Sequence, residues 1–293
     1  MKRFDLALMA HSVIASWVFL TAVLPGQRAC GEEPSFTVMA ANLSGENGVY
    51  GESAHRILQG LKPDIVALQE WVLSKESHRE FVDRTLGAEF LYCVELESSD
   101  GIPNGIISRW PILASGEWRD PIVLNRDYAW ATIDLPGPRK LHVVSVHLKS
   151  GEETYAKLGR WRQAETLIRY IRRAKWSPSD YLVIAGDFNV VGRNEKAMLL
   201  LGQLVSTERQ PVDQNGDKTT NIPRTQTYDY VLPNPALEEQ QVPLQLNRRT
   251  FSEGLVFDSR VWATPPAPIL SGDSSAEDMQ HLAVMKAFRL PAD

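Results

Sequence analysis

The sequence has few cysteines, no excess of positive charge and no internal repeat. Only Cys30 and Cys93 occur among 293 residues, which excludes a disulfide-stabilised scaffold. Its 36 acidic residues outnumber 31 basic ones and give a net charge of −5, which is poorly suited to holding duplex DNA by charge alone. With 43% hydrophobic residues the chain can bury a sizeable core, so we expect residues 32–293 to form one domain.

The N-terminus has the pattern of an export signal. Lys2 and Arg3 precede an uncharged stretch over residues 6–24, which Pro25 and Gly26 interrupt. We therefore predict a signal peptide at residues 1–31 and a secreted or periplasmic protein after cleavage. The stretch is long for a signal, so a membrane anchor through residues 6–24 is the alternative. Acylation of Cys30 is less favoured.

Short apolar runs alternate with amphipathic segments along the rest of the chain, which predicts an α/β fold. We expect strands near residues 36–41, 65–68, 90–96, 104–108, 112 onward, 128–135, 141–146, 181–185, 228–232 and 282–285. We expect helices near residues 50–61, 78–86, 153–175 and 194–201. In the third helix the spacing predicts a buried face that includes Leu158 and Ile168, with Arg160 and the other basic residues mostly on a solvated face.

Polar side chains stand at the ends of six of these strands. Four follow their strands and two precede them, and in that order they are Asn42, Glu70, His147, Asp187, Asp229 and His281. Taken alone, Asn and Asp at these places are ordinary turn residues, and a single histidine after a strand is usually structural. If the last two strands run antiparallel to the others, however, all six side chains arrive at one edge. Glu70 directly follows four apolar residues, so we expect it to need a partner such as a cation.

These residue types fit hydrolysis of a phosphate ester. Glu70 is a hard oxygen ligand of the kind that Mg²⁺ prefers. Asp187 can orient or deprotonate a water, helped by Asn189 in the segment Gly186 to Asn189, where the glycine allows close approach to the backbone. The two histidines and Asn42 can hold phosphate oxygens, and Asp229 can orient a histidine or help to bind the metal.

A second acidic segment resembles a calcium loop only in part. Asp213, Asn215 and Asp217 have the alternating spacing of oxygen ligands. Lys218 stands where an EF-hand needs glycine, and Arg224 where it needs glutamate. We therefore expect a solvated turn here, and Ca²⁺ is the least favoured ion.

Several short motifs follow one another in the order of a known family. After Asn42 they are LQE at Leu68, SRWPI at Ser108, HL at His147, GDFN at Gly186, YDYVL at Tyr228 and HLAV at His281. In this set the chain resembles the endonuclease/exonuclease/phosphatase superfamily, which includes deoxyribonuclease I, exonuclease III and the neutral sphingomyelinases.

The resemblance implies a four-layer sandwich of two packed mixed β-sheets flanked by helices, and cleavage of phosphate esters that depends on Mg²⁺ or Mn²⁺. It implies metal ligands at Glu70, Asn42 and Asp187 and substrate contacts at Asn42, Asn104 and Asn189. The remaining assignments are catalytic: His147, Asp187, Asn189, Asp229 and His281.

One residue departs from the family pattern. Members usually have aspartate before the last histidine, whereas Gln280 stands there in this chain. Glutamine supplies no charge and is expected to leave His281 less basic, unless Asp278 replaces the missing carboxylate. A second hypothesis is therefore a member that has lost catalysis and binds a ligand or protein.

The type of reaction and the substrate are less closely determined. A glycosidase that uses Glu70 and Asp187 as an acid/base pair would leave the histidines unexplained. The sequence lacks the Trp-Cys-Asp-Arg signature of inositol polyphosphate 5-phosphatases. Nucleic acid, a lipid headgroup and a small phosphate ester all remain open as substrates. We expect a monomer with no obligate protein partner.

Overall fold

A computed structural model describes four parts of the chain, residues 34–44, 49–95, 101–276 and 279–290. The predicted signal segment, Cys30 and Asp278 lie outside these described residues. Within them, no helix is both long and apolar enough to cross a membrane.

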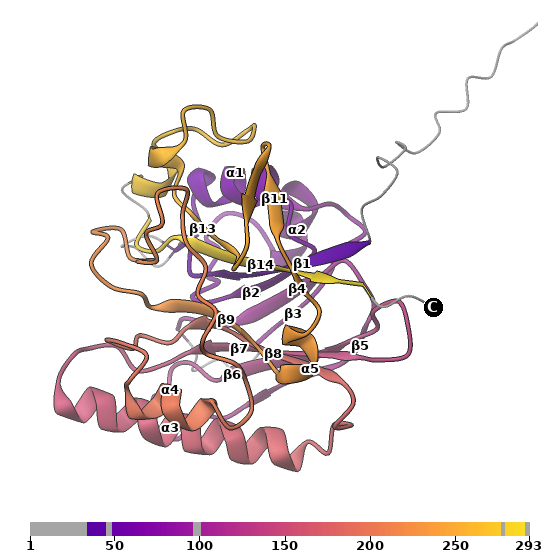
Figure 1. The fold of residues 1–293 in the computed structure, drawn as a ribbon, viewed down its shortest axis with the longest axis vertical. Helices are drawn as coiled ribbons and strands as arrows, with labels where there is room; N and C mark the ends of the chain where they lie inside the picture. Colours follow the sequence, from indigo (N-terminus) through magenta and orange to yellow (C-terminus); the bar gives the residue numbers. More distant parts are fainter. Residues whose placement is uncertain (1–33, 45–48, 96–100, 277–278, 291–293) are drawn as a thin grey trace, which may run out of the picture. The chain divides into compact units, whose positions relative to one another are not determined.

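Two mixed β-sheets pack face to face in the described part of the chain (Figure 1). The first sheet has seven strands: β10 (Gln241–Val242), β14 (Ala283–Arg289), β1 (Ser35–Ala41), β2 (Ile65–Leu68), β4 (Gly105–Ser108) and β3 (Leu91–Val94) in spatial order, with β13 (Leu255–Phe257) also paired to β14. The second has five strands in chain order: β5 (Ile112–Trp118), β6 (Tyr128–Ile133), β7 (Leu141–His147), β8 (Tyr181–Asp187) and β9 (Asp229–Pro233).

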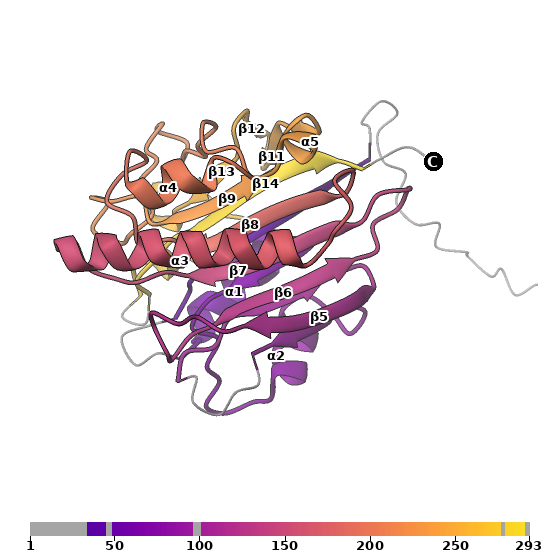
Figure 2. The same cartoon turned by 90° about the horizontal axis from the view of Figure 1, so that it is seen from below.

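Helices cover the outer face of each sheet. The helices α1 (Glu52–Leu61) and α2 (His78–Thr85) share a core with the first sheet, and α3 (Thr154–Arg173) and α4 (Lys196–Leu201) share one with the second. Figure 2 shows α3 lying across the second sheet. The predicted four-layer sandwich is therefore confirmed. Smaller elements are α5 (Pro235–Glu238), the ribbon of β11 (Leu244–Leu246) and β12 (Arg249–Phe251), and the 3₁₀ turns η1 (Ser259–Val261) and η2 (Asp273–Ser275).

Strand β1 shows how the sequence specifies these layers. Phe36, Val38 and Ala40 belong to the core between the two sheets, whereas Met39 and Ala41 belong to the core under the helices. Successive side chains of a strand point to opposite faces, so a strand buried on both sides must be apolar throughout. This is why the central strands appear as short continuous apolar runs.

The directions of two strands decide where the polar strand ends lie. β14 runs antiparallel to β1, and β9 runs antiparallel to β8, which is the condition for the six polar side chains to meet. β1 and β2 are parallel, and so are β7 and β8. The beginnings of β9 and β14 therefore lie at the same edges as the ends of β8 and β1.

The predicted faces of α3 were partly wrong. Leu158 is 41% exposed, whereas Arg160 is fully buried. The helix turns a strip containing Arg160 and Gln163 toward the loops that follow β7 and β8, and these polar side chains bond to those loops. A hydrophobic period cannot reveal a charge that is buried because it has partners.

The prediction of a solvated turn at residues 213–217 was also wrong in part. Asp213 is buried, and its Oδ2 accepts a hydrogen bond of 2.7 Å from Arg224. Arg224 also pairs with Asp217 at 2.9 Å and with Asp258 at 3.4 Å. The guanidinium supplies the positive charge that these carboxylates need, which argues against a calcium ion there.

The short strands β10 to β13 were not predicted. They have two or three residues each, which is too few to show a hydrophobic period.

Candidate functional site

The structure brings seven of the eight predicted site residues together, between the edges of the two sheets. The first sheet contributes residues at the ends of β1 and β2 and at the beginning of β14, and the second contributes residues at the ends of β7 and β8 and at the beginning of β9. In that order they are Asn42, Glu70, His281, His147, Asp187 with Asn189, and Asp229. All except Glu70 are buried.

Asp187 is the centre of this group. Its Oδ2 accepts hydrogen bonds from the side-chain amides of Asn42 at 3.2 Å and Asn189 at 3.0 Å, and its Oδ1 accepts the backbone N–H of Asn189 at 2.9 Å. Nε2 of His147 is 3.3 Å from the same Oδ2. Burial raises the pKa of Asp187 to about 7. A carboxylate with this pKa can exchange a proton near neutral pH.

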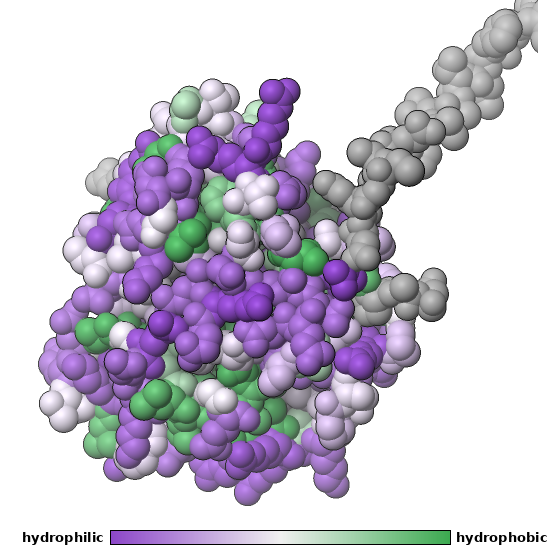
Figure 3. Space-filling view, viewed as in Figure 1, coloured by the Kyte–Doolittle hydropathy of each residue, from purple (hydrophilic) through white to green (hydrophobic). Residues whose placement is uncertain are grey.

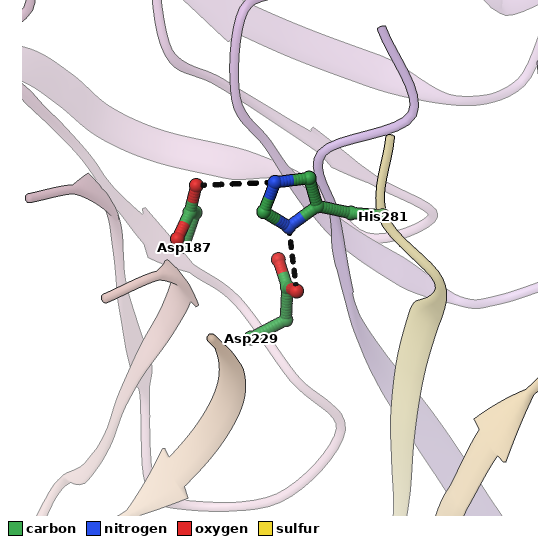
Figure 4. A group of neighbouring side chains, drawn as sticks. All are labelled: Asp187, Asp229 and His281. Atoms are coloured by element: carbon green, nitrogen blue, oxygen red, sulfur yellow. Dashed lines mark hydrogen bonds and ion pairs between the residues drawn. The ribbon is translucent and has the colours of Figure 1, made fainter. Parts of the chain in front are cut away.

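His281 lies between two carboxylates (Figure 4). Its Nδ1 is 2.8 Å from Oδ2 of Asp229, and its Nε2 is 3.7 Å from Oδ2 of Asp187. Burial disfavours the imidazolium, but the two carboxylates outweigh this effect and raise the pKa of His281 to about 10. Thr220 fixes the pair by donating a 2.7 Å hydrogen bond to Asp229. The expectation that Gln280 leaves a less basic histidine was therefore wrong, because Asp229 provides the carboxylate.

Glu70 and Asn42 form the part of the site that is best suited to a metal ion. The Ser44 hydroxyl donates to Oε2 of Glu70 at 2.8 Å, and the Asn42 amide nitrogen is 3.5 Å from Oε1. His147 lies 3.7 Å from Glu70, but burial and the nearby Arg126 lower the pKa of His147 well below its usual range. A neutral imidazole does not balance the Glu70 charge. The Asn42 amide oxygen accepts a 3.3 Å hydrogen bond from the same Ser44 hydroxyl. Carboxylate and amide oxygens are the hard donors that Mg²⁺ and Mn²⁺ bind, so the residue types present fit such an ion.

A second cluster of metal-ligand type is less suitable. Potential ligand atoms of Asp187, Asp229 and His281 all lie within 4.8 Å of one another. In this cluster, however, the His281 imidazole, whose pKa is raised, already lies between the two carboxylates and balances part of their charge. Glu70 and Asn42 therefore fit a divalent ion better than this cluster does.

Three residues of the site adopt left-handed backbone conformations. The φ angles are 51° at Glu70, 50° at Asn189 and 141° at Gly186. Non-glycine residues in this region are uncommon and cluster at functional sites. Gly186 also needs its missing side chain, because a Cβ there would overlap the Val146 carbonyl oxygen and lie 2.8 Å from Nε2 of Gln69. Gln69 bridges the two sheets beneath the site, with a 2.9 Å bond to Ser145. The predicted close approach at Gly186 is therefore present.

The structure does not join Asn104 to this group by any hydrogen bond among the described residues. Asn104 is fully buried, and its amide donates a 2.6 Å hydrogen bond to the carbonyl of Asp127. This bond holds the segment that carries Arg126. A substrate contact at Asn104 stays a prediction, whereas Arg126 was not predicted.

Arg126 is a buried cation near the site. It is 9% exposed, its Nε has no hydrogen-bond partner among the described residues, and one terminal nitrogen is 3.4 Å from the Leu148 carbonyl. Burial lowers the pKa of Arg126, and the carboxylates of Asp187 and Glu70 oppose this effect. A guanidinium with an open donor beside this carboxylate cluster is suited to hold a phosphate oxygen.

A buried ion pair fixes the two loops that follow the site residues. Arg160 bonds both carboxylate oxygens of Glu195, at 2.6 and 3.0 Å. It also donates to the carbonyls of Lys149 at 2.7 Å and Gly151 at 2.8 Å. Glu195 in turn accepts the backbone N–H of Val191 at 3.2 Å. The pair therefore ties the loop after His147 to the loop after Asn189.

Solved structures of low sequence identity share this fold, whereas no curated protein matches the sequence. The human Nocturnin catalytic domain with bound sulfate anion is 15% identical, with a TM-score of 0.62 over 89% of this chain and 96% of that chain. An endonuclease/exonuclease/phosphatase from Beutenbergia cavernae DSM 12333 is 16% identical, with a TM-score of 0.60 over 88% and 72%. TDP2 from Caenorhabditis elegans is 16% identical, with a TM-score of 0.54 over 87% and 97%.

The family model described as Endonuclease/Exonuclease/phosphatase family matches residues 39–251, which is most of the chain. This match covers Glu70, His147, Asp187 and Asp229 and agrees with the two-sheet fold. The chain therefore belongs to the endonuclease/exonuclease/phosphatase family, whose members are metal-dependent phosphoesterases.

Proposed function

We propose that this protein hydrolyses a phosphodiester or phosphomonoester by in-line attack of an activated water, with a divalent metal ion. The observation that carries the proposal is the position of Asp187. Its carboxylate lies beside an imidazole paired to Asp229 on one side, and on the other it accepts a hydrogen bond from the Asn42 amide, which also lies 3.5 Å from Glu70. This arrangement offers a base, a cation for the phosphate and a metal-binding pair within one site.

Asp187 is the base that takes a proton from the attacking water. Its raised pKa of about 7 suits this role, since a base works best when its pKa lies near the operating pH. The Asn189 amide donates both to Asp187 at 3.0 Å and to the Leu148 carbonyl at 3.1 Å, so the amide and carboxylate are held in a fixed relation. They orient the water toward the phosphorus.

His281 holds a phosphate oxygen. It remains protonated at neutral pH because of Asp229, so it offers a charged donor where negative charge develops. Arg126 provides a second charged donor from the opposite sheet. The neutral His147 contributes a hydrogen bond without charge.

The metal completes the site at Glu70 and Asn42. Bound Mg²⁺ or Mn²⁺ would neutralise charge on the phosphate and on the leaving oxygen. Ser44 orients the Glu70 carboxylate through its 2.8 Å hydrogen bond, and the Asn42 amide is held by Asp187. The ligand oxygens are therefore positioned by hydrogen bonds that do not depend on the ion.

The proposal is tested with the purified protein and bis(p-nitrophenyl) phosphate, in Mg²⁺ or Mn²⁺. We expect hydrolysis that EDTA abolishes and that Asp187→Asn lowers by about 10²- to 10⁴-fold, the usual contribution of a general base. The matched control is Asp134→Asn, which changes an exposed carboxylate and should leave the rate unchanged. Activity that survives both EDTA and Asp187→Asn would exclude this function. Metal binding without turnover of any ester would favour the degenerate binding protein instead.

We further propose that the protein is exported, on the support of Lys2, Arg3 and the uncharged stretch at residues 6–24. N-terminal sequencing of protein recovered outside the cytoplasm tests this. A mature N-terminus near residue 32 is expected. Recovery of the whole chain in the membrane fraction would favour the anchor.

A further inference from the structure

A polar groove of about 560 Å³ is lined by segments that adjoin the site residues in the sequence. Its walls come from residues 191–195 after β8, residues 218–219 and 225–227 before β9, and Lys157 on α3. These segments are far apart in the sequence. They meet at this edge of the second sheet because α3 follows β7, α4 follows β8, and β9 begins there.

The groove is continuous in sequence with the site on two sides. Val191 lies two residues after Asn189, and Thr227 lies two residues before Asp229. Tyr228, between Thr227 and Asp229, has its ring centroid 5.9 Å from that of the His281 ring, so the segment that lines the groove also reaches the site. A substrate bound at the site with its phosphate near Asp187 can therefore extend into this groove.

The groove carries positive charge on a chain whose net charge is −5. Lys157 and Lys218 are exposed and form no ion pair among the described residues. Arg193 adds a third cation, held 3.3 Å from the exposed Glu208. The acidic residue in the lining is Glu195, whose carboxylate is already neutralised by Arg160. The groove therefore favours an anion.

The rest of the lining can form hydrogen bonds and offers little apolar surface. Its amides and hydroxyls are Asn194, Gln210, Thr219, Thr225, Gln226 and Thr227. Val191 is half-buried and the Tyr230 ring is buried in the core, so neither presents a broad apolar surface. An acyl chain would gain nothing here, whereas a sugar or another polar alcohol would find partners. Figure 3 shows that hydrophilic residues also cover most of one face of the molecule, with smaller hydrophobic patches.

We propose that this basic groove, formed around Lys157, Arg193 and Lys218, binds the part of the substrate beyond the cleaved phosphate, and that this part is a polar alcohol carrying a second phosphate. The inference rests on the proposed function, because it assumes that a phosphate ester is bound at Asp187. It narrows the substrate to a class that includes sugar bisphosphates and nucleotide chains. A zwitterionic lipid headgroup lies outside this class.

The test compares two esters with the same leaving group, the p-nitrophenyl ester of thymidine 5′-phosphate with and without a 3′-phosphate. In the wild type, the second phosphate should raise kcat/KM about five- to tenfold through KM, the effect of two partly screened cations. Added salt should reduce this ratio. In the variant Lys157→Gln/Lys218→Gln, the ratio of kcat/KM with the second phosphate to kcat/KM without it should be close to one.

The control variant is Lys140→Gln/Lys175→Gln, which makes the same charge change at two exposed lysines. Lys140 precedes β7, at the edge of the sheet opposite the site. The control should keep the wild-type ratio. A wild-type ratio of one, an equal loss of ratio in the control, or faster cleavage of p-nitrophenylphosphorylcholine than of both thymidine esters would overturn the proposal.

A binding measurement separates this inference from the proposed function. Calorimetric titration with thymidine 3′,5′-bisphosphate and thymidine 5′-phosphate should show tighter binding of the bisphosphate to the wild type and not to the Lys157→Gln/Lys218→Gln variant. That result supports binding of a second phosphate in the groove even if no ester is hydrolysed. Equal binding of the two ligands to the wild type refutes such binding even if esters are hydrolysed.

Discussion

Replacement of Arg160 by methionine tests how the loops beside the site are held. The substitution keeps a long side chain and the helical propensity of α3 but removes all four hydrogen bonds of the guanidinium. Glu195 would then be a buried carboxylate without its partner, and two loop carbonyls would lose their donor. The loops that follow His147 and Asn189 would no longer be tied to each other.

The expected loss of stability is large for a single substitution. Breaking a buried ion pair by removal of one partner costs about 3–5 kcal/mol, because the remaining charge stays buried. For a domain of this size that corresponds to a fall in Tm of roughly 6–20 °C. Activity on bis(p-nitrophenyl) phosphate should fall at least tenfold at temperatures where the variant is folded, because the Leu148 carbonyl that holds Asn189 belongs to the released loop.

Urea unfolding and initial rates measure the two effects, with Arg162→Met as the matched control on the exposed side of the same helix. Arg160→Lys should recover part of both losses, since an ammonium can reach either the carboxylate or a carbonyl. The double variant Arg160→Met/Glu195→Gln should be more stable than Arg160→Met alone, because it removes the unpaired charge. If Arg160→Met unfolds within about 1 kcal/mol of Arg162→Met, the ion pair does not stabilise these loops.

Four further outcomes are expected from changes to single residues. Gly186→Ala should destabilise the fold by about 3 kcal/mol or more in urea unfolding, because φ is 141° and the new methyl group meets a backbone oxygen. Asp229→Asn should lower the pKa of His281, so the alkaline limb of the pH–rate profile should move to lower pH; an unmoved limb would contradict the role of that pair. Arg126→Met should raise KM at least tenfold yet change the free energy of unfolding by less than about 1 kcal/mol, since the buried cation is only weakly bonded; an unchanged KM would exclude phosphate binding. Burial lowers the pKa of Lys286 to about 8, so between pH 8 and 10 the folded chain loses a proton that the unfolded chain keeps. Over that range the wild type should therefore gain about 2 kcal/mol of stability relative to Lys286→Met. A difference in free energy of unfolding that does not change with pH would contradict the burial of the charge.

The layers and the central strands could be predicted because their signals are local. A strand between two cores must be apolar on both faces, as β1 and β8 are, and such runs are visible in one sequence. Strands β10 to β13 could not be found, because their places are set by pairing with β14 and with each other. The sequence of a strand of two or three residues does not indicate which distant strand it pairs with.

The buried charges were mispredicted for a related reason. Arg160 and Asp213 have the local pattern of surface residues, and only their partners, Glu195 and Arg224, make burial favourable. The sequence alone does not show which residues of opposite charge form an ion pair in the folded protein. For His281 the carboxylate partner is Asp229, 52 residues earlier in the chain, which was expected to orient a histidine from its place before a strand.

Arg126 stands at the beginning of a strand, as Asp229 and His281 do, but this strand end was not included among the six. Asp229 and His281 were found because each precedes a strand that runs antiparallel to its neighbour. Arg126 and Asp127 precede β6, which is antiparallel to β7, so the beginning of β6 lies at the same edge as the end of β7 and its terminal His147. The hairpin of β6 and β7 was itself predicted from the turn between them. Applied to that hairpin, the rule places Arg126 at the edge where β7 ends, just as it places Asn104, which precedes β4, at the edge where β2 ends.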